Sequence, residues 1–296
     1  MKLLKKFLWL GLGLLALVAV GVGVLAWRGD AKMARRWQIE PASSTVATAG
    51  ADLAEGERLA QIRGCKECHG ADLGGQVLAL APIAALVPPN LTRGQGGVTA
   101  NYTDRDWQLA IRHGIGPGGR PLILMPSDDN TNMSESDFAA LVAYLKSLPP
   151  VDRQMQPTAF TFLGRVLLGA GQLPLLTAER IDHSIKPHAD APVASIEQGA
   201  YLAQICAGCH RPDFSGGVMG GMPPEAPPAA NLTPAGNLSR WTLEQFRTAL
   251  RTGVRPDGRV LIKEFMPWPA AAGFTDEEIE ALYRYFQTLP KVETRQ

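Results

Sequence analysis

The cysteines of this 296-residue chain number 4, and they fall into two pairs, each followed directly by a histidine. The two groups are Cys65, Cys68 and His69, and Cys206, Cys209 and His210. Two thiols about one helical turn apart can bond the vinyl groups on one edge of a porphyrin, and the next residue presents an imidazole to the iron. The C-x-x-C-H spacing therefore predicts covalently attached c-type haem.

Two other readings of the cysteine pairs are weaker. A four-cysteine zinc site is possible in principle because C-x-x-C is also half of such a site. With only 5 His in the chain, a histidine would follow both pairs by chance in about 3 of 10,000 cases, which favours haem. A thioredoxin-like redox pair would need a surrounding βαβ pattern, and neither motif has one. We expect two covalently attached haem c groups.

Two methionines stand where a second axial ligand is needed. Met125 and Met266 follow their motif histidines at the same separation in sequence (125 − 69 = 266 − 210), and each precedes a proline. A single methionine is commonly core filler, but identical placement in both halves favours a ligand. The thioether stabilises ferrous iron, which suits electron transfer. We predict His69 with Met125, and His210 with Met266, as the iron ligands.

Other side chains compete for the first iron. Met133 is the rival of Met125, but the corresponding residue of the second half is Phe274, which cannot bind iron. His113 corresponds to Thr252, so we expect it on the surface or in packing. Two further histidines are expected to be solvated, namely His183 and His188.

The chain repeats itself at a constant offset in residue number, 206 − 65 = 141. The same offset relates Asn90-Leu-Thr to Asn231-Leu-Thr, Met125-Pro to Met266-Pro, and Leu148-Pro to Leu289-Pro. Self-similarity of this kind predicts two copies of one domain. We place them at residues 50–150 and 195–292, joined by a connector over residues 151–194.

Helix signals predict a mainly α fold. Each copy ends in a capping-box pattern before an apolar run at helical spacing, and these patterns are Ser134 with Asp137 and Thr275 with Glu278. Shorter helices are expected at 53–62, 104–113, 196–205 and 242–252. Because no strict alternation occurs between them, we expect no strands. The connector is expected to lie over the seam between the two domains.

The amino terminus carries a segment that can cross a membrane. Residues 7–27 hold no charge, and 21 residues at about 1.5 Å each match the ~30 Å hydrocarbon layer. Trp9 and Trp27 lie where interfacial aromatic residues occur. A cleaved signal peptide is the alternative, but its apolar region is usually about 7–15 residues long. We therefore expect an uncleaved transmembrane helix, with residues 1–6 in the cytoplasm.

Composition excludes several classes of protein. Hydrophobic residues make up 46% of the chain, enough for buried cores, while 19% charged residues are too many for an all-membrane protein. Lys and Arg total 29 against 28 Asp and Glu, a formal charge of +1. Without a basic excess there is little to neutralise a phosphate backbone, so nucleic acid is not an expected partner.

Taken together, the C-x-x-C-H, Asn-Leu-Thr and Met-Pro motifs make the chain similar to dihaem class I c-type cytochromes, with two tandem cytochrome c domains behind a membrane anchor. The resemblance implies that each domain is a small helical fold wrapped around a haem. It also implies that haem is attached outside the bacterial cytoplasm. The expected location is the bacterial inner membrane, crossed once, with both haem domains in the periplasm.

Electron transfer is the function that this resemblance implies. The chain would carry electrons between a respiratory or dehydrogenase partner and a periplasmic acceptor, without catalysis of its own. The redox partner would be a dehydrogenase, a quinol-oxidising complex or a terminal oxidase. A dihaem peroxidase is the alternative, but it needs one haem with an open position. The letters G-x-G-x-x-G at Gly114, Gly116 and Gly119 follow an expected helix rather than a strand, so they predict no dinucleotide site.

Overall fold

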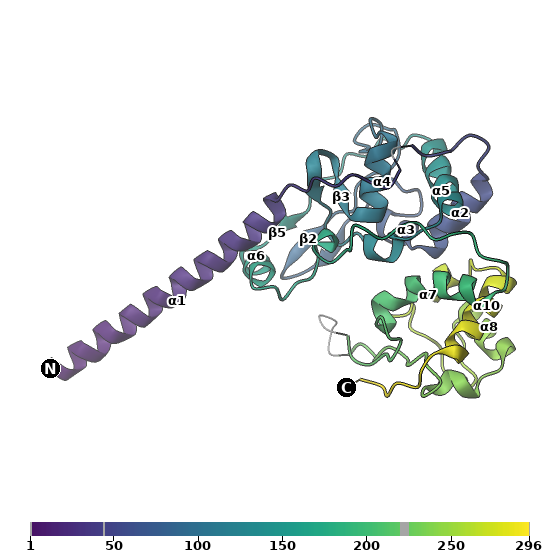
Figure 1. Ribbon diagram of the computed structural model, residues 1–296. Coiled ribbons are helices and arrows are strands. Elements are labelled where there is room, and N and C mark those ends of the chain that lie inside the picture. The colour runs from purple at the N-terminus through teal and green to yellow at the C-terminus, as the bar shows by residue number, and fades with distance from the viewer. Residues whose placement is uncertain (1, 44, 220–224, 296) are drawn as a thin grey trace.

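The computed structural model describes residues 2–43, 45–219 and 225–295 (Figure 1). Two helical lobes follow helix α1 (Lys2–Ala34), which projects from the first of them. The first lobe is built on the helices between residues 53 and 147, and the second on those between residues 196 and 288. The predicted mainly α fold is confirmed. The molecule consists of one long apolar helix and two packed helical lobes.

The helix α1 is longer than the apolar segment that predicted it. Its most apolar 18-residue window has a mean hydropathy of 2.5 and is 0% buried, so the helix is long and apolar enough to cross a membrane. It begins before residue 7 and continues past Trp27 to Ala34. The extra turns hold Arg28, which is exposed, and Asp30 and Lys32, which form ion pairs with Arg165 and Glu179.

The first lobe contains four helices. They are α2 (Leu53–Ile62), α3 (Cys65–His69), α4 (Asp104–His113) and α5 (Glu135–Ser147). The predictions for 53–62 and 104–113 are confirmed. Gly64, which follows α2, has φ 71°, a left-handed conformation that costs glycine little. This turn separates α2 from the helix that carries the first cysteine pair.

The second lobe has the same plan with one difference. Its helices are α7 (Ile196–His210), α8 (Leu243–Thr252), α9 (Trp268–Ala271) and α10 (Asp276–Thr288). The predicted end of α7 at residue 205 was too early, because the helix runs on through the second cysteine pair to His210. Ile205, rather than a glycine in the left-handed conformation, precedes Cys206, so the helix is not interrupted there.

Each lobe is held by one close crossing of helices. A Cβ atom at Gly56 would clash with the carbonyl oxygen of Ala140, and one at Gly199 would clash with that of Ala281. Only glycine lets α2 approach α5, and α7 approach α10, this closely. The two glycines are related by an offset of 143 (199 − 56), so on these helices position 58 corresponds to position 201.

Short strands occur where none was expected. Strands β1 (Leu78–Leu80), β2 (Ala84–Leu86) and β5 (Ala159–Phe160) form one antiparallel sheet. Strands β3 (Ile115–Gly116) and β4 (Arg120–Pro121) form a second. The expectation was wrong because such short strands are too brief to show an alternating pattern. Here the turns, rather than side-chain periodicity, bring the backbones together.

The connector does not lie over the seam, and that expectation was wrong. Its helix α6 (Phe162–Gly169) packs along α1, and β5 pairs with β2 of the first lobe. Farther on, Leu124 N donates to Leu175 O (2.7 Å). Only its end, near His188, reaches the second lobe. The apolar side chains of the connector are covered chiefly by the anchor helix and the first lobe, because these offer the nearest apolar surfaces.

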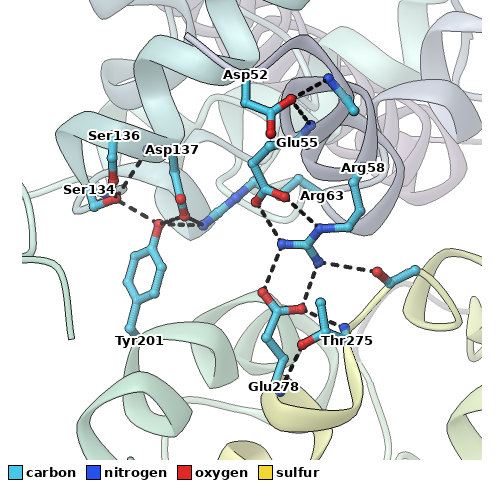
Figure 2. A network of polar contacts seen from close by, with 12 residues as sticks. Asp52, Glu55, Arg58, Arg63, Ser134, Ser136, Asp137, Tyr201, Thr275 and Glu278 are labelled. Atoms are coloured by element: carbon cyan, nitrogen blue, oxygen red, sulfur yellow. Dashed lines mark hydrogen bonds and ion pairs between the residues drawn. The ribbon is translucent and has the colours of Figure 1, made fainter. Parts of the chain in front are cut away.

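The two lobes meet through equivalent side chains (Figure 2). Arg58 of α2 binds Glu278, in the first turn of α10, with Nη1 to Oε2 at 2.6 Å and Nη2 to Oε1 at 2.8 Å. Tyr201 of α7 donates its hydroxyl to Asp137 Oδ2, in the first turn of α5, at 2.6 Å. Arg58 and Tyr201 occupy corresponding positions in their lobes. Each one contacts the first turn of the last helix of the other lobe. This reciprocity is the pattern of an approximate two-fold axis within one chain.

The seam also explains an asymmetry between the two caps. The predicted capping box at Thr275 and Glu278 is complete. At Ser134 only half forms, because the hydroxyl of Tyr201 accepts the Ser134 N–H (3.2 Å) and Asp137 accepts from that hydroxyl instead. The prediction of a full capping box there was wrong, because the Tyr201 hydroxyl of the other lobe, rather than the Asp137 carboxylate, accepts the Ser134 N–H.

Candidate haem sites

The first lobe encloses a cavity of about 280 Å³ beside the first cysteine pair. Cys65, Cys68 and His69 line it from α3, and Met125 lines it from the loop before the 3-10 helix η2 (Ser127–Asn130). Most of the remaining wall is apolar, and it includes Leu86, Leu91, Trp107, Ile111, Leu141 and Leu145. The four predicted site residues of this lobe therefore share one largely apolar chamber.

Both motif histidines are oriented by a backbone carbonyl. Nδ1 of His69 lies 2.8 Å from the carbonyl oxygen of Pro89, and Nδ1 of His210 lies 2.7 Å from that of Ala230. The acceptors are again related by the offset of 141 (230 − 89). A carbonyl can only accept, so the proton sits on Nδ1 and Nε2 keeps its lone pair for a metal. Burial lowers the pKa of both imidazoles, which favours the neutral, ligating form.

The Asn-Leu-Thr motif fixes the loop that supplies these carbonyls. Nδ2 of Asn90 donates to the carbonyl of Val151 (2.7 Å), and Oδ1 accepts from the backbone N–H of Thr92 (2.8 Å). Asn231 makes the same two contacts, with Val292 at 2.7 Å and Thr233 at 2.9 Å. Each asparagine directly follows the residue whose carbonyl accepts from the histidine. Its side chain therefore anchors that loop to the segment after the last helix of the same lobe.

The cysteines are free thiols. Burial raises the pKa of Cys65 and of Cys206 to about 12, so both are protonated at neutral pH. Among the described residues, which include all four cysteines, no three His, Cys, Asp or Glu side chains converge as metal ligands. Cys65 and Cys68 lie on α3 and Cys206 and Cys209 on α7, so within the described residues the two pairs do not form one four-cysteine cluster.

Met133, the rival of Met125, lies in the apolar core with 0% of its surface exposed and is absent from the cavity wall. Its counterpart Phe274 is buried in the same core. Met266 is partly buried against that core. Met133 and Phe274 therefore correspond because both pack in the core. Of the two candidate methionines of the first lobe, only Met125 both lines the chamber and corresponds to a methionine of the second lobe.

None of the remaining histidines lines the chamber of the first lobe. His113 is buried, 4% exposed, with Nδ1 3.1 Å from Nδ1 of His183. His188 stacks on Tyr201, with ring centroids 5.1 Å apart. The expectation that His183 and His188 are solvated was wrong, because the connector folds back onto the lobes and half-buries both rings.

Two functional contacts escaped the sequence. Arg63 lines the chamber with a buried side chain, where Nη1 donates to Asn130 Oδ1 (3.0 Å) and Nη2 to the hydroxyl of Tyr201 (2.8 Å). Thr177 of the connector donates its hydroxyl to the carbonyl of Met125 (2.8 Å). Arg63 corresponds to Gln204 at the offset of 141, and Thr177 lies in the connector outside the repeat, so the offset could not reveal either contact.

Comparison with known proteins agrees with the two-lobe plan. The family model of cytochrome c matches residues 53–149 and again residues 196–290. Over 266 residues the chain is 26% identical to the cytochrome c subunit of a quinone-dependent alcohol dehydrogenase from Gluconacetobacter polyoxogenes. That match covers 80% of this chain and 56% of the relative, so the chain spans little more than half of that subunit.

Two further relatives differ in extent. A dihaem c-type cytochrome of Cereibacter sphaeroides is 26% identical over 273 residues, which cover 82% of this chain and 87% of that protein. The cytochrome subunit of a fructose dehydrogenase from Gluconobacter japonicus is 35% identical over 145 residues, covering 46% of this chain and 29% of that one. The two matched regions coincide with the two lobes, and the chain belongs to the cytochrome c family as a tandem of two cytochrome c domains behind an apolar amino-terminal helix.

Proposed function

We propose that this protein is a membrane-anchored, dihaem electron-transfer subunit. It would pass electrons from a dehydrogenase or quinol-oxidising partner to an acceptor in the periplasm. Relatives that are named as cytochrome subunits of alcohol and fructose dehydrogenases support the dehydrogenase partner. The apolar helix α1 supports the anchor.

The proposal assigns one haem to each lobe. In the first lobe Cys65 and Cys68 would attach the haem covalently, and His69 and Met125 would hold the iron. In the second lobe the same roles fall to Cys206, Cys209, His210 and Met266. The observation that carries this assignment is the carbonyl acceptor on Nδ1 of both histidines, because it leaves Nε2 free in both lobes.

The chain's own residues set the conditions for electron transfer. Bound haem supplies an iron that changes between ferric and ferrous states. Pro89 and Ala230 hold the imidazole rings in one orientation, so little rearranges when the charge of the iron changes. In the first lobe, Leu141, Leu145 and Trp107 exclude water, which favours the less charged ferrous centre.

Two filled axial positions would separate electron transfer from catalysis. A peroxidase needs one iron that peroxide can reach, whereas here each lobe offers a methionine at the same distance from its histidine in sequence. The hydroxyl of Thr177 further restrains the loop that carries Met125. We therefore infer that neither lobe acts on substrate, and that oxidation of the organic substrate belongs to a partner chain.

The location follows from the attachment chemistry that the family resemblance implies. Haem joined to these cysteines outside the bacterial cytoplasm requires export of both lobes. Long domains cross the membrane largely regardless of the charges beside a span. We therefore propose a single crossing of the inner membrane by α1, with residues 1–6 in the cytoplasm and both lobes in the periplasm.

Intact mass spectrometry of the full chain purified from membranes tests this proposal. We expect the mass of the uncleaved polypeptide plus two haems. The double variant Cys65→Ser with Cys68→Ser should lose one haem and keep the other, and Cys206→Ser with Cys209→Ser is the matched variant. A chain without haem, or one that carries zinc, would overturn the haem assignment. A mature start near Trp27 would overturn the anchor alone.

A further inference from the structure

Helix α6 packs beside the outer end of α1 (Figure 1), and the residues in contact show that the two run antiparallel. A Cβ atom at Gly29 would clash with the carbonyl oxygen of Arg165, and one at Gly169 would clash with that of Leu25. Since position on α6 increases as position on α1 decreases, α6 runs toward the end of α1 that would lie in the membrane. The two backbones touch at both glycines, which leaves no space between them for lipid or water.

Ion pairs join the same two segments farther from the membrane. Asp30 accepts from Nη1 of Arg165 at 3.2 Å, and Lys32 donates to Glu179 at 3.0 Å. Between Arg165 and Glu179 the connector carries no charge, so the whole stretch 166–178 is uncharged. The charged contacts therefore lie on the outer side of the pair, and the uncharged run lies on the side toward the membrane.

The height of this uncharged run can be read from α1. Residues 7–27 are the apolar span, so Trp27 marks its outer edge. Leu25, which touches Gly169, lies inside that edge. The turn that follows α6 is therefore at the level of the lipid boundary, and its residues Ala170, Gly171 and Gln172 are exposed. A charged turn at this depth would be costly, and this one has no charge.

The same connector is tied to the first haem chamber. Strand β5, just before α6, pairs with β2, whose Leu86 lines the chamber. After the turn, Leu175 O accepts from Leu124 N (2.7 Å), and Thr177 donates to the carbonyl of Met125 (2.8 Å). The uncharged turn is thus held at both ends by backbone that shapes the first site.

We propose that the end of α6 and the turn at 170–173 form a second contact with the lipid bilayer, beside α1. Two contacts fix the height and rotation of the first lobe over the membrane, which a single flexible tether would leave free. The second lobe is joined to this arrangement through the seam. This inference rests on the proposed retention of α1, and it names lipid as the partner of a surface to which no role has been assigned.

Photo-cross-linking to lipid tests the second contact in the full-length haem protein. The protein is placed in nanodiscs of phosphatidylethanolamine and phosphatidylglycerol that contain a phospholipid with a diazirine near its headgroup. We expect lipid adducts on peptides from residues 7–27 and also on residues 166–178. The exposed stretch 182–186 of the same connector should stay free of adducts. Adducts confined to residues 7–27 would overturn the proposal.

Matched glycine variants sharpen the test. Gly29→Leu should separate α6 from α1 and remove most adducts from residues 166–178, whereas Gly21→Leu, at a glycine with nothing within 4 Å, should keep them. Ala170→Asp offers a variant that leaves the helix contact intact, and it too should lower the adduct yield, with Ser184→Asp as its control. Unchanged haem spectra confirm that the variants are folded.

The test separates the two levels of inference. A mature chain without residues 7–27 would mean that α1 is cleaved, and the proposed anchor itself would fail. A retained α1 with no adducts at 166–178, in wild type or Gly21→Leu, would leave the anchor standing and refute the second lipid contact. Adducts that persist in Gly29→Leu would refute the role of the α1–α6 pair in holding that contact.

Discussion

The two lobes share their histidine geometry but differ in what covers them. The contacts of Nδ1 to the backbone carbonyl are 2.8 and 2.7 Å, and both asparagines donate to their carbonyl at 2.7 Å. In the first lobe the connector packs over the loop that carries Met125. In the second, Val260 and Ile262, which precede Met266, are 64% and 50% exposed. Repeated residues thus build the inner site, and unrepeated residues decide its access to solvent.

The two sites therefore differ in how their methionine loops are covered. The loop of the first site lies beneath the connector, which also packs along the anchor helix. The second site has exposed apolar side chains beside its methionine and is farther along the chain from the anchor. The two sites are joined by a seam built from Arg58, Tyr201 and their partners.

Removal of either methionine should have the largest effect and should be confined to one lobe. Met125→Ala should open the first iron alone and lower its reduction potential, because the thioether that favours ferrous iron is gone. Axial ligands set haem potentials over a range of about 0.8 V, so the shift should be large. Met266→Ala should do the same at the second iron. Spectroscopic redox titration of both variants, with Met133→Leu as the control, measures the effect.

A change in both potentials from a single substitution would contradict separate pockets. An unchanged first potential in Met125→Ala would instead return Met133 or His113 to consideration as the ligand.

The seam should respond equally to substitution from either side. Arg58→Ala removes two hydrogen bonds to the buried Glu278 carboxylate, and Tyr201→Phe removes the hydroxyl shared by Arg63, Ser134 and Asp137. Each should lower the free energy of unfolding by about 2 kcal/mol. Denaturant unfolding measures this, and Arg284→Ala, which removes an exposed ion pair within α10, should change stability by about 0.5 kcal/mol or less. A large loss from only one of the two seam variants would refute the reciprocal arrangement.

Acid should weaken the first lobe through a group that the second lacks. Burial first, and then His183 and Arg112, lower the pKa of His113 to about 4, and the corresponding residue of the second lobe is Thr252. The unfolded chain takes up a proton near pH 6.5 but the folded chain does not, so stability falls as the pH drops from about 6.5 toward 4. The slope is at most about 1.4 kcal/mol per pH unit for this single group.

Denaturant unfolding of wild type and His113→Gln between pH 7 and pH 4.5 checks this expectation. The slope should shrink in the variant, while His188→Gln should keep it. An equal slope in wild type and His113→Gln would show that His113 is already protonated in the folded lobe.

The smallest effect is expected at the two helix caps. Loss of a serine or threonine cap costs about 1 kcal/mol. Thr275→Ala and Ser134→Ala should both reach about this value, because each side chain accepts one backbone N–H. Glu278→Gln should weaken the seam as well, since its carboxylate also receives Arg58. Thermal unfolding resolves these differences, and a neutral Thr275→Ala would contradict the cap.

The repeated residues made much of this structure predictable. The helices at 53–62 and 104–113 follow from cap residues and apolar spacing, and the place of Met125 in the chamber was implied by its correspondence with Met266. The acceptors of His69 and His210 were not foreseeable, because a carbonyl oxygen belongs to every residue. What marks Pro89 and Ala230 is only their position before Asn-Leu-Thr.

Tertiary contacts account for the remaining errors. Tyr201 altered a local cap at Ser134, far from it in sequence, and the connector followed the nearest apolar surface rather than the seam. Tyr201 corresponds in position to Arg58, a different residue type, and the connector has no counterpart in the repeat. The sequence repeat describes the residues within one lobe. It cannot predict contacts between the two lobes, or between a lobe and the anchor helix.

Carbon monoxide binding to the fully reduced wild-type protein tests the central claim most directly. If both lobes hold haem iron between a histidine and a methionine, neither should bind carbon monoxide readily, and the ferrous spectrum should stay unchanged on titration. Met125→Ala and Met266→Ala should each gain one binding site, which shows that the assay detects an open iron. Stoichiometric binding at one haem of the wild type would contradict two closed sites and would favour a peroxidase-type enzyme instead.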